Sequence, residues 1–148
     1  MRIRPAQAAH AERLRAIAQA AKGHWGYDRG LVERWASTYD FPRQLREQEV
    51  LVAERDGEVA AWAAVTPPVD GVAVLEDLWV EPARIGEGIG SLLFSAICAR
   101  AAELGAQRLE WQSEPNATGF YERLGARHLR DEISEWGRTL PVMGIPVL

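Results

Sequence analysis

The sequence predicts one α/β domain spanning residues 1–148, built on a mixed, mostly antiparallel sheet of about six to seven strands with helices on both faces. A length of 148 residues suits a single domain with a buried core. The composition, 47% hydrophobic and 26% charged, is close to that of soluble globular proteins. Several strand-like segments follow one another without an intervening helix, which argues against a regularly alternating parallel sheet.

The N-terminal segment is predicted to be mainly helical. Residues 2–4 have the length of a short first strand, and residues 6–22 carry apolar side chains at helical spacing. The sequence Gly-His-Trp-Gly-Tyr at 23–27 breaks that helix. A second helix is expected at 28–37, with Asp28 as its N-cap. Its apolar face consists of Leu31, Val32 and Trp35.

Strand signals dominate the middle of the chain. Two hydrophobic runs, at 50–54 and 59–66, flank the sequence Arg-Asp-Gly-Glu at 55–58. Asp-Gly between two such runs is a strong signal for a β-hairpin. A turn that contains proline and glycine follows at 67–71, and the next strand is expected at 72–80.

The remaining chain is predicted to form a strand–helix–strand crossover, a short helix and a terminal hairpin. The expected elements are a helix at 88–104, a strand at 108–112, a short helix at 115–124, and two strands at about 128–134 and 138–145. Gly105 and Gly125 end the two helices.

Composition and charge make some classes of partner and cellular location less consistent with this sequence than others. The net charge of −4 argues against nucleic acid as the main partner. No run approaches the roughly 20 apolar residues of a membrane span, and the N-terminus shows no secretory signal. The single cysteine rules out an intramolecular disulfide and favours a reducing, cytoplasmic setting. The terminal hairpin or an exposed edge strand could pair two copies into a homodimer.

No metal site is expected. The three histidines, His10, His24 and His128, and the one cysteine, Cys98, show none of the spacings that metal ligands adopt. Cys98 lies in the middle of a predicted helix, where nothing suggests a base or an electropositive setting, and we interpret it as a packing residue.

A glycine-rich segment follows the strand at 72–80. Residues 80–91 read Val-Glu-Pro-Ala-Arg-Ile-Gly-Glu-Gly-Ile-Gly-Ser, so three glycines stand at every second position just before a helical pattern begins. Because glycine leaves backbone N–H groups uncovered and a helix start carries a partial positive charge, residues 85–91 can cradle a pyrophosphate or another polyanion. The alternative is a tight strand-to-helix turn that needs glycine only for its backbone geometry.

Two known phosphate motifs fit this segment badly. A Walker loop requires Gly-Lys-Ser/Thr, whereas Gly90 is followed by Ser91 and Leu92. A dinucleotide fingerprint requires an early strand–helix–strand unit, whereas this segment lies past the middle of the chain, after a series of antiparallel strands.

On these residues the sequence resembles the GNAT superfamily of N-acetyltransferases, most strongly over 74–126. Leu-Trp-Val-Glu-Pro at 78–82 and the glycines after it resemble the cofactor motif of that family. Asn-Ala-Thr-Gly-Phe-Tyr-Glu-Arg-Leu-Gly-Ala at 116–126 resembles its second signature. One position departs from the pattern: the family usually has Arg or Gln where this chain has Ile85, and here the arginine is displaced to Arg84.

The resemblance implies acetyl-CoA as the cofactor. The strand at 78–80 would pair with the pantetheine arm as an added strand would, and a backbone N–H near Leu78 or Trp79 would polarise the thioester carbonyl. The implied cofactor-binding residues are Leu78, Trp79, Val80, Ile85, Gly86, Glu87, Gly88, Ile89, Gly90, Ser91, Asn116, Phe120 and Tyr121.

Tyr121 is the first choice for a general acid under this resemblance. Attack of an amine on a thioester expels a thiolate, and a tyrosine at hydrogen-bond distance can give it a proton. The alternative is a core tyrosine on a helix face beside Phe120. Asn116 would cap the short helix and bond the cofactor arm, or serve only as the N-cap.

The base is expected among the acids Glu76 and Asp77. Strand alternation puts their side chains on opposite faces unless a bulge re-aims one of them. The sequence Leu-Glu-Asp-Leu at 75–78 is similar to that of polyamine acetyltransferases in the same superfamily, where these acids face the amine. Glu76 is preferred over Asp77, directly or through a water. The alternative is a solvated strand end or a salt bridge to an arginine.

The acceptor site is expected near His24, Trp25 and Tyr27, because the loop between the first two helices borders the acceptor in this family. His24 could be an auxiliary base or a half-buried structural histidine, and Trp111 is expected in the core. The predicted function is acetyl transfer from acetyl-CoA to a primary amine of a small molecule by direct attack. The alternatives are a protein lysine or N-terminal acetyltransferase, and a non-catalytic CoA-binding regulatory module.

Overall fold

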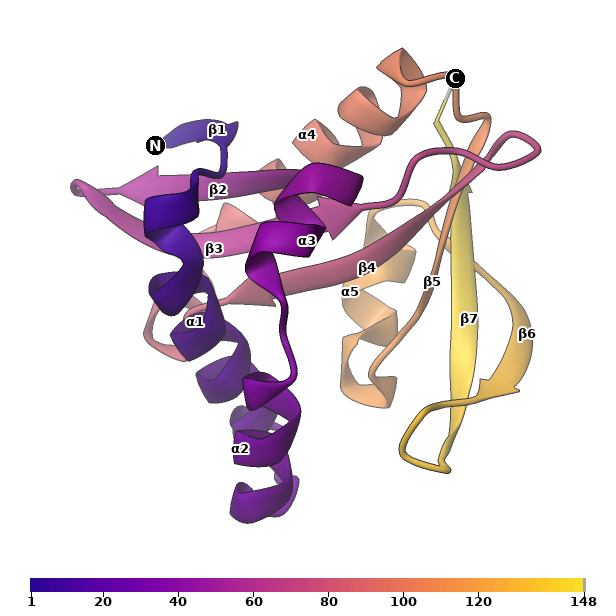
Figure 1. Ribbon diagram of the computed structural model, residues 1–148. Coiled ribbons are helices and arrows are strands. Elements are labelled where there is room, and N and C mark those ends of the chain that lie inside the picture. Colours follow the sequence, from indigo (N-terminus) through magenta and orange to yellow (C-terminus); the bar gives the residue numbers. More distant parts are fainter. Residues whose placement is uncertain (148) are drawn as a thin grey trace. The chain divides into compact units, whose positions relative to one another are not determined.

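The computed structural model describes residues 1–147 (Figure 1). The chain divides into two compact units, and strand β4 (Val72–Val80) contributes residues to both of them. The first unit comprises Met1–Thr66 and Glu76–Ile97. The second comprises Pro67–Leu75 and the chain from Cys98 onward. Strand order is β1-β2-β3-β4 in the first unit and β4-β5-β7-β6 in the second.

The first unit begins with a short strand and three helices and continues with a hairpin. Its elements are β1 (Arg2–Pro5), α1 (Ala11–His24), α2 (Arg29–Ser37), α3 (Phe41–Glu47), β2 (Glu49–Arg55) and β3 (Glu58–Val65). Single 3-10 turns, η1 (Ala8–His10) and η2 (Pro82–Arg84), precede α1 and follow β4. Helix α4 (Ile89–Glu103) starts in this unit.

The second unit carries the strands of the C-terminal half. Its elements are β5 (Arg108–Gln112), the 3-10 turn η3 (Pro115–Ala117), α5 (Thr118–Arg123), β6 (Arg127–Ile133) and β7 (Thr139–Pro146). Strand β5 pairs parallel with the start of β4 and antiparallel with β7, which pairs antiparallel with β6. Together with the antiparallel pairs β1–β2 and β2–β3, this confirms the mixed, mostly antiparallel sheet.

The hairpin between β2 and β3 forms where Asp-Gly predicts it. Asp56 and Gly57 both have positive φ, 56° and 78°, and Arg55 pairs with Glu58. Two central residues with φ > 0 give the turn a twist that matches the twist of the flanking strands. The prediction is confirmed because this turn is determined by two adjacent residues.

Strands β2 and β3 are buried on both faces, since consecutive residues along them are inaccessible. On one face Val52 and Trp62 pack against Leu14 and Ile17 of α1, and all four side chains are fully buried. The Trp62 indole Nε1 donates a hydrogen bond to the Leu14 carbonyl at 2.9 Å, so the ring adds no unsatisfied polar group to this core.

Two predictions about the N-terminal helices need correction, one helix was missed, and one prediction is confirmed. The first helix extends through His24, so the chain leaves the helix at Trp25 rather than at residue 23. Leu31 is exposed and does not share the buried face of α2. Helix α3 was not predicted, although Asp40 followed by Pro42 is a helix-start signal. Asp28 does cap α2, because its carboxylate accepts the Leu31 N–H at 3.0 Å.

Candidate functional site

The segment between β4 and α4 is an open turn built on two left-handed glycines. Gly86 and Gly88 have φ values of 93° and 81°, a conformation that side chains with a Cβ rarely adopt. A Cβ placed on either glycine would meet no heavy atom within 4 Å. Both glycines therefore serve the backbone conformation and leave the space beside it open.

Five backbone N–H groups in this turn donate no hydrogen bond within residues 1–147. They belong to Gly86, Gly88, Ile89, Gly90 and Ser91. The last three are the first donors of α4, which lack acceptors inside the helix and lie at its partially positive end. A row of unpaired donors at a helix start binds an oxyanion, and its length suits a diphosphate.

The side chains around this turn pair with one another. Glu87 lies 3.1 Å from Arg55 and 3.4 Å from Arg84, measured from its Oε1 to a guanidinium nitrogen. Arg84 also reaches Asp56 at 3.2 Å. Arg84, the arginine that stands one position before the family's usual Arg or Gln, therefore pairs with two acids. Ile85, which occupies the family position, is exposed. The groups that this turn leaves available to an anion are therefore its backbone N–H groups.

The two acids of β4 lie on opposite faces, as strand alternation predicts. Glu76 is exposed, whereas Asp77 is only 6% exposed. The Asp77 carboxylate accepts hydrogen bonds from the Tyr39 hydroxyl, from Trp79 Nε1 at 2.9 Å and from Gln44 Nε2 at 2.7 Å. These donors come from three places, the segment before α3, strand β4 and helix α3.

Burial raises the pKa of Asp77 above its ordinary value, because a buried charge loses its hydration. The bonds from Tyr39, Trp79 and Gln44 and the charge of Lys22 oppose this rise without reversing it. A carboxylate offers about four acceptor sites, so three donors leave one available. Asp77 is thus a carboxyl group fixed by three donors, and its pKa lies above the ordinary value for an aspartate.

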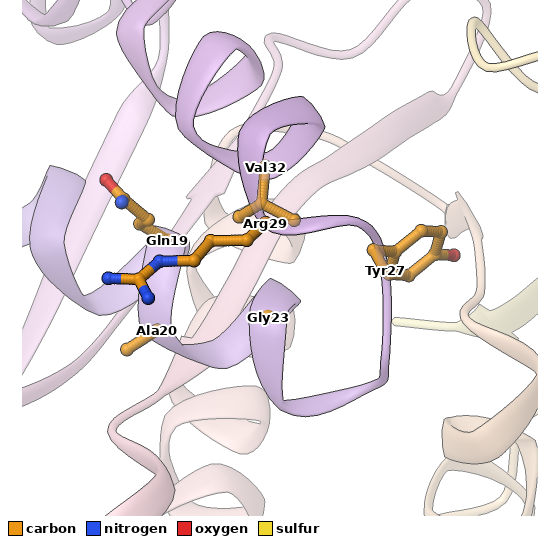
Figure 2. Close-up of a pocket in the computed structure, with 6 residues that line it drawn as sticks. All are labelled: Gln19, Ala20, Gly23, Tyr27, Arg29 and Val32. Atoms are coloured by element: carbon orange, nitrogen blue, oxygen red, sulfur yellow. The ribbon is translucent and has the colours of Figure 1, made fainter.

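The loop after α1 contains the three predicted acceptor residues, which differ in exposure. His24 and Trp25 are exposed and contact each other edge to face, with ring centroids 5.2 Å apart. Tyr27 is half-buried and lines a pocket of about 330 Å³ between α1 and α2. Figure 2 shows Arg29 extended toward Gln19 in this pocket, with the Tyr27 ring lying apart from them beyond Gly23.

In the second unit, Tyr121 is buried on α5 with 7% of its surface exposed. Its ring lies 4.8 Å from that of Trp111 and 5.0 Å from that of Phe120, between ring centroids. Burial raises the pKa of the Tyr121 hydroxyl, so the group keeps its proton throughout the neutral range. Trp111 is 3% exposed, which places it in the core as predicted.

Asn116 does not cap the short helix, contrary to the prediction. The 3-10 turn η3 contains Asn116, and the N-cap of α5 is Ala117, without a side-chain bond. The Thr118 hydroxyl instead donates to the Pro115 carbonyl at 3.1 Å. The Asn116 side chain is exposed, so its amide is accessible to a ligand.

Tyr39 and Gln44 were missed by sequence reasoning. Nothing in the sequence near either residue marks it as a partner of a β4 acid. The only available signal was the start of α3 at Asp40, which would have placed Gln44 on a helix.

The structure offers neither a reactive thiol at Cys98 nor, among the described residues, a metal-binding cluster. Burial raises the pKa of the Cys98 thiol to about 11, so it is protonated at neutral pH and is a poor nucleophile. Within residues 1–147, no group of three or more His, Cys, Asp or Glu side chains is arranged to hold a metal ion. No helix in that range is both long enough and apolar enough to cross a membrane.

Two proteins named as acetyltransferases share sequence with this chain. A mycothiol acetyltransferase from Nocardia farcinica is 34% identical over 100 residues, which are 66% of this chain and 32% of that protein. An L-ornithine N5-acetyltransferase from Arabidopsis thaliana is 33% identical over 60 residues, which are 38% of this chain and 26% of that protein. The chain thus spans about a third of the length of these relatives or less.

The fold and the family agree with the resemblance seen in the sequence. The PaiA N-acetyltransferase of Thermoplasma acidophilum, solved in complex with coenzyme A, has a TM-score of 0.82 at 16% identity, over 98% of each chain. The family model described as "Acetyltransferase (GNAT) family" matches residues 12–126, which include both sequence motifs. Because this match covers most of its length, the chain belongs to the acetyltransferase (GNAT) family.

Proposed function

We propose that this protein is an acetyl-CoA-dependent N-acetyltransferase that modifies a primary amine of a small molecule by direct attack. The observation that carries the proposal is the row of five unpaired N–H groups beside Gly86 and Gly88, in a chain that belongs to an acetyltransferase family. That row fits the diphosphate of CoA, and the family supplies the acetyl chemistry.

The cofactor-binding residues are assigned by element. Backbone groups at Leu78–Val80 hold the pantetheine arm, and the backbone from Ile85 to Ser91 holds the diphosphate. Asn116 and Phe120 contribute from the second signature. Acetyl-CoA, when bound, supplies an acetyl group activated as a thioester.

Two side chains move the protons. Asp77 accepts the proton of the attacking amine, directly or through a water, and is ranked ahead of Glu76 because burial raises its pKa toward the working pH. Tyr121 delivers its proton to the departing sulfur and regains one from solvent. It can do so because its hydroxyl remains protonated at neutral pH. The product amide forms as the carbon–sulfur bond breaks.

A small-molecule acceptor is supported by the relatives. Mycothiol acetyltransferase and L-ornithine N5-acetyltransferase are named for small substrates. The half-buried Tyr27 and the pocket of about 330 Å³ that it lines also suit a compact ligand rather than a folded protein surface.

The test is a thiol-release assay with purified protein and acetyl-CoA. We expect turnover with a panel of diamines, polyamines, amino acids and aminoglycosides, and little with peptides that carry lysine or a free N-terminus. Turnover confined to the peptides would contradict the acceptor class. Binding of CoA by calorimetry without turnover on either panel would identify a regulatory module instead.

A further inference from the structure

Lys22 places its ammonium group among three aromatic rings of the first unit. Its Nζ lies 4.9 Å from the ring centroid of Tyr27, 4.9 Å from that of Trp35 and 5.7 Å from that of Trp79. Three rings around one cation form an aromatic cage, an arrangement that proteins use to recognise ammonium ligands. We call Tyr27, Trp35 and Trp79 the cage.

The cage adjoins the carboxylate assigned as the base. Trp79 and Asp77 share a face of β4, and the Trp79 indole donates to the Asp77 carboxylate at 2.9 Å. The positive charge of Lys22 acts on this carboxylate and favours its ionised form. A cation held in the cage is therefore stabilised by the ring faces and by a nearby negative charge.

The residue that fills the cage is chemically distinctive. The chain contains 17 Lys and Arg residues, and Lys22 is the only lysine among them. Lysine carries a compact ammonium on a flexible alkyl stem, whereas arginine carries a planar guanidinium. The caged group is thus an alkylammonium, the functional group of an amine acceptor. Of the cage residues, Tyr27 also lines the pocket of about 330 Å³.

We propose that the cage binds a second, charged ammonium group of the acceptor, and that the Lys22 ammonium occupies the cage until the acceptor displaces it. The inference rests on the proposed function, since it names the acceptor of that reaction. An attacking amine must be neutral, whereas a cage favours a charged group, so the caged group is not the one that reacts. The substrate class is therefore a diamine or polyamine.

The first experiment follows Lys22 in the wild-type protein without acetyl-CoA. Because the chain has one lysine, protein labelled with ¹³C-lysine gives a single side-chain ε-methylene NMR signal, which the rings should shift upfield. We expect tetramethylammonium chloride to move this signal toward that of an exposed lysine, and sodium chloride at equal ionic strength to leave it in place. A signal that tetramethylammonium does not move overturns the proposal.

Matched variants test whether the rings are responsible. Trp35→Leu should place the lysine signal near the exposed position before any titration, whereas Arg29→Ala, which removes an exposed neighbouring cation, should leave the signal as in the wild type. Thermal unfolding establishes that each variant is folded. A lysine signal that is the same in Trp35→Leu and the wild type also overturns the proposal.

The second experiment uses turnover and separates this inference from the proposed function. We expect Trp35→Leu to lower kcat/KM for 1,5-diaminopentane at least tenfold more than for pentylamine. An equal loss of kcat/KM for the two amines would exclude the cage as a binding site for the acceptor. If the protein turns over no amine, the proposed function fails, while the lysine titration still reports whether the cage exchanges its cation.

Discussion

Burial acts on Tyr121 and Asp77 in the same direction but with different chemical consequences. It raises both pKa values, because both groups are charged only after losing a proton. Tyr121 is neutral at pH 7 with or without this shift, so burial only secures the proton that the proposed mechanism requires it to donate. For Asp77 the shift moves the carboxyl toward the pH at which an amine has to be deprotonated.

Replacing Tyr121 by Phe should lower kcat by roughly 10²–10⁴-fold, the usual contribution of a general acid. Its affinity for CoA should change little, because the substitution removes only a hydroxyl. Steady-state kinetics and calorimetric titration measure the two quantities. Unchanged turnover in a folded Tyr121→Phe protein would remove Tyr121 from the mechanism.

Replacing Asp77 by Asn should change how stability depends on pH. The folded-state pKa of Asp77 is raised, so its contribution to stability is fully present below the unfolded pKa of about 3.9 and is lost as pH rises through the folded pKa. An asparagine does not titrate, so the variant should gain stability relative to the wild type over the pH range above the unfolded pKa of about 3.9.

Urea unfolding across that pH range measures this difference, with Glu76→Gln as the matched control. Glu76 is the adjacent acid, exposed on the opposite face of β4, so its replacement controls for the loss of one carboxyl group from this strand. A constant difference between Asp77→Asn and the wild type would show that the buried carboxyl does not titrate in this range. In activity assays, Asp77→Asn should lose more kcat/KM than Glu76→Gln.

Glycine has two uses in the turn between β4 and α4. The positive φ of Gly86 and Gly88 shapes the backbone, while the open space beside each of them keeps the N–H groups accessible. The two uses can be tested separately because Gly57 has almost the same φ, 78°, in a hairpin turn with equally open surroundings.

Gly88→Val and Gly57→Val should therefore have different effects on cofactor binding. Both should lose stability, by about 1–2 kcal/mol, because a side chain is strained at positive φ. Only Gly88→Val should weaken CoA binding, by tenfold or more, because its branched side chain would cover the N–H row. Calorimetry on folded samples measures the affinity. Wild-type CoA affinity in Gly88→Val would contradict the cradle.

Cofactor binding should stabilise the folded chain as a whole. A ligand present at 100 times its Kd adds about 2.7 kcal/mol to the free energy of unfolding. For a chain of 148 residues this corresponds to a rise in Tm of roughly 5–10 °C, measured by scanning calorimetry. Pantetheine lacks the diphosphate and should give a much smaller shift at the same concentration. Equal shifts would locate the binding energy away from the N–H row.

Most of the elements and the open turn before α4 could be predicted from the sequence because their causes are local. Asp56 and Gly57 determine a hairpin turn, Asp28 caps the helix that follows it, and the glycines before α4 determine an open turn. The family resemblance, now confirmed, rests on the same kind of contiguous residues at 78–90 and 116–126. One failure is local too: Asn116 lies within a 3-10 turn that sequence signals do not distinguish from a helix start.

The environment of Asp77 could not be predicted in this way, because it is assembled from distant segments. Tyr39 and Gln44 donate to its carboxylate from 38 and 33 residues away along the chain. Strand alternation gives Glu76 and Asp77 opposite faces, but only the packing of α2 and α3 determines which face is buried and which donors reach it. The same packing gathers the rings of the cage around Lys22. Side-chain desolvation and long-range contacts are properties of the folded chain, and they decide which of two adjacent acids is buried among hydrogen-bond donors.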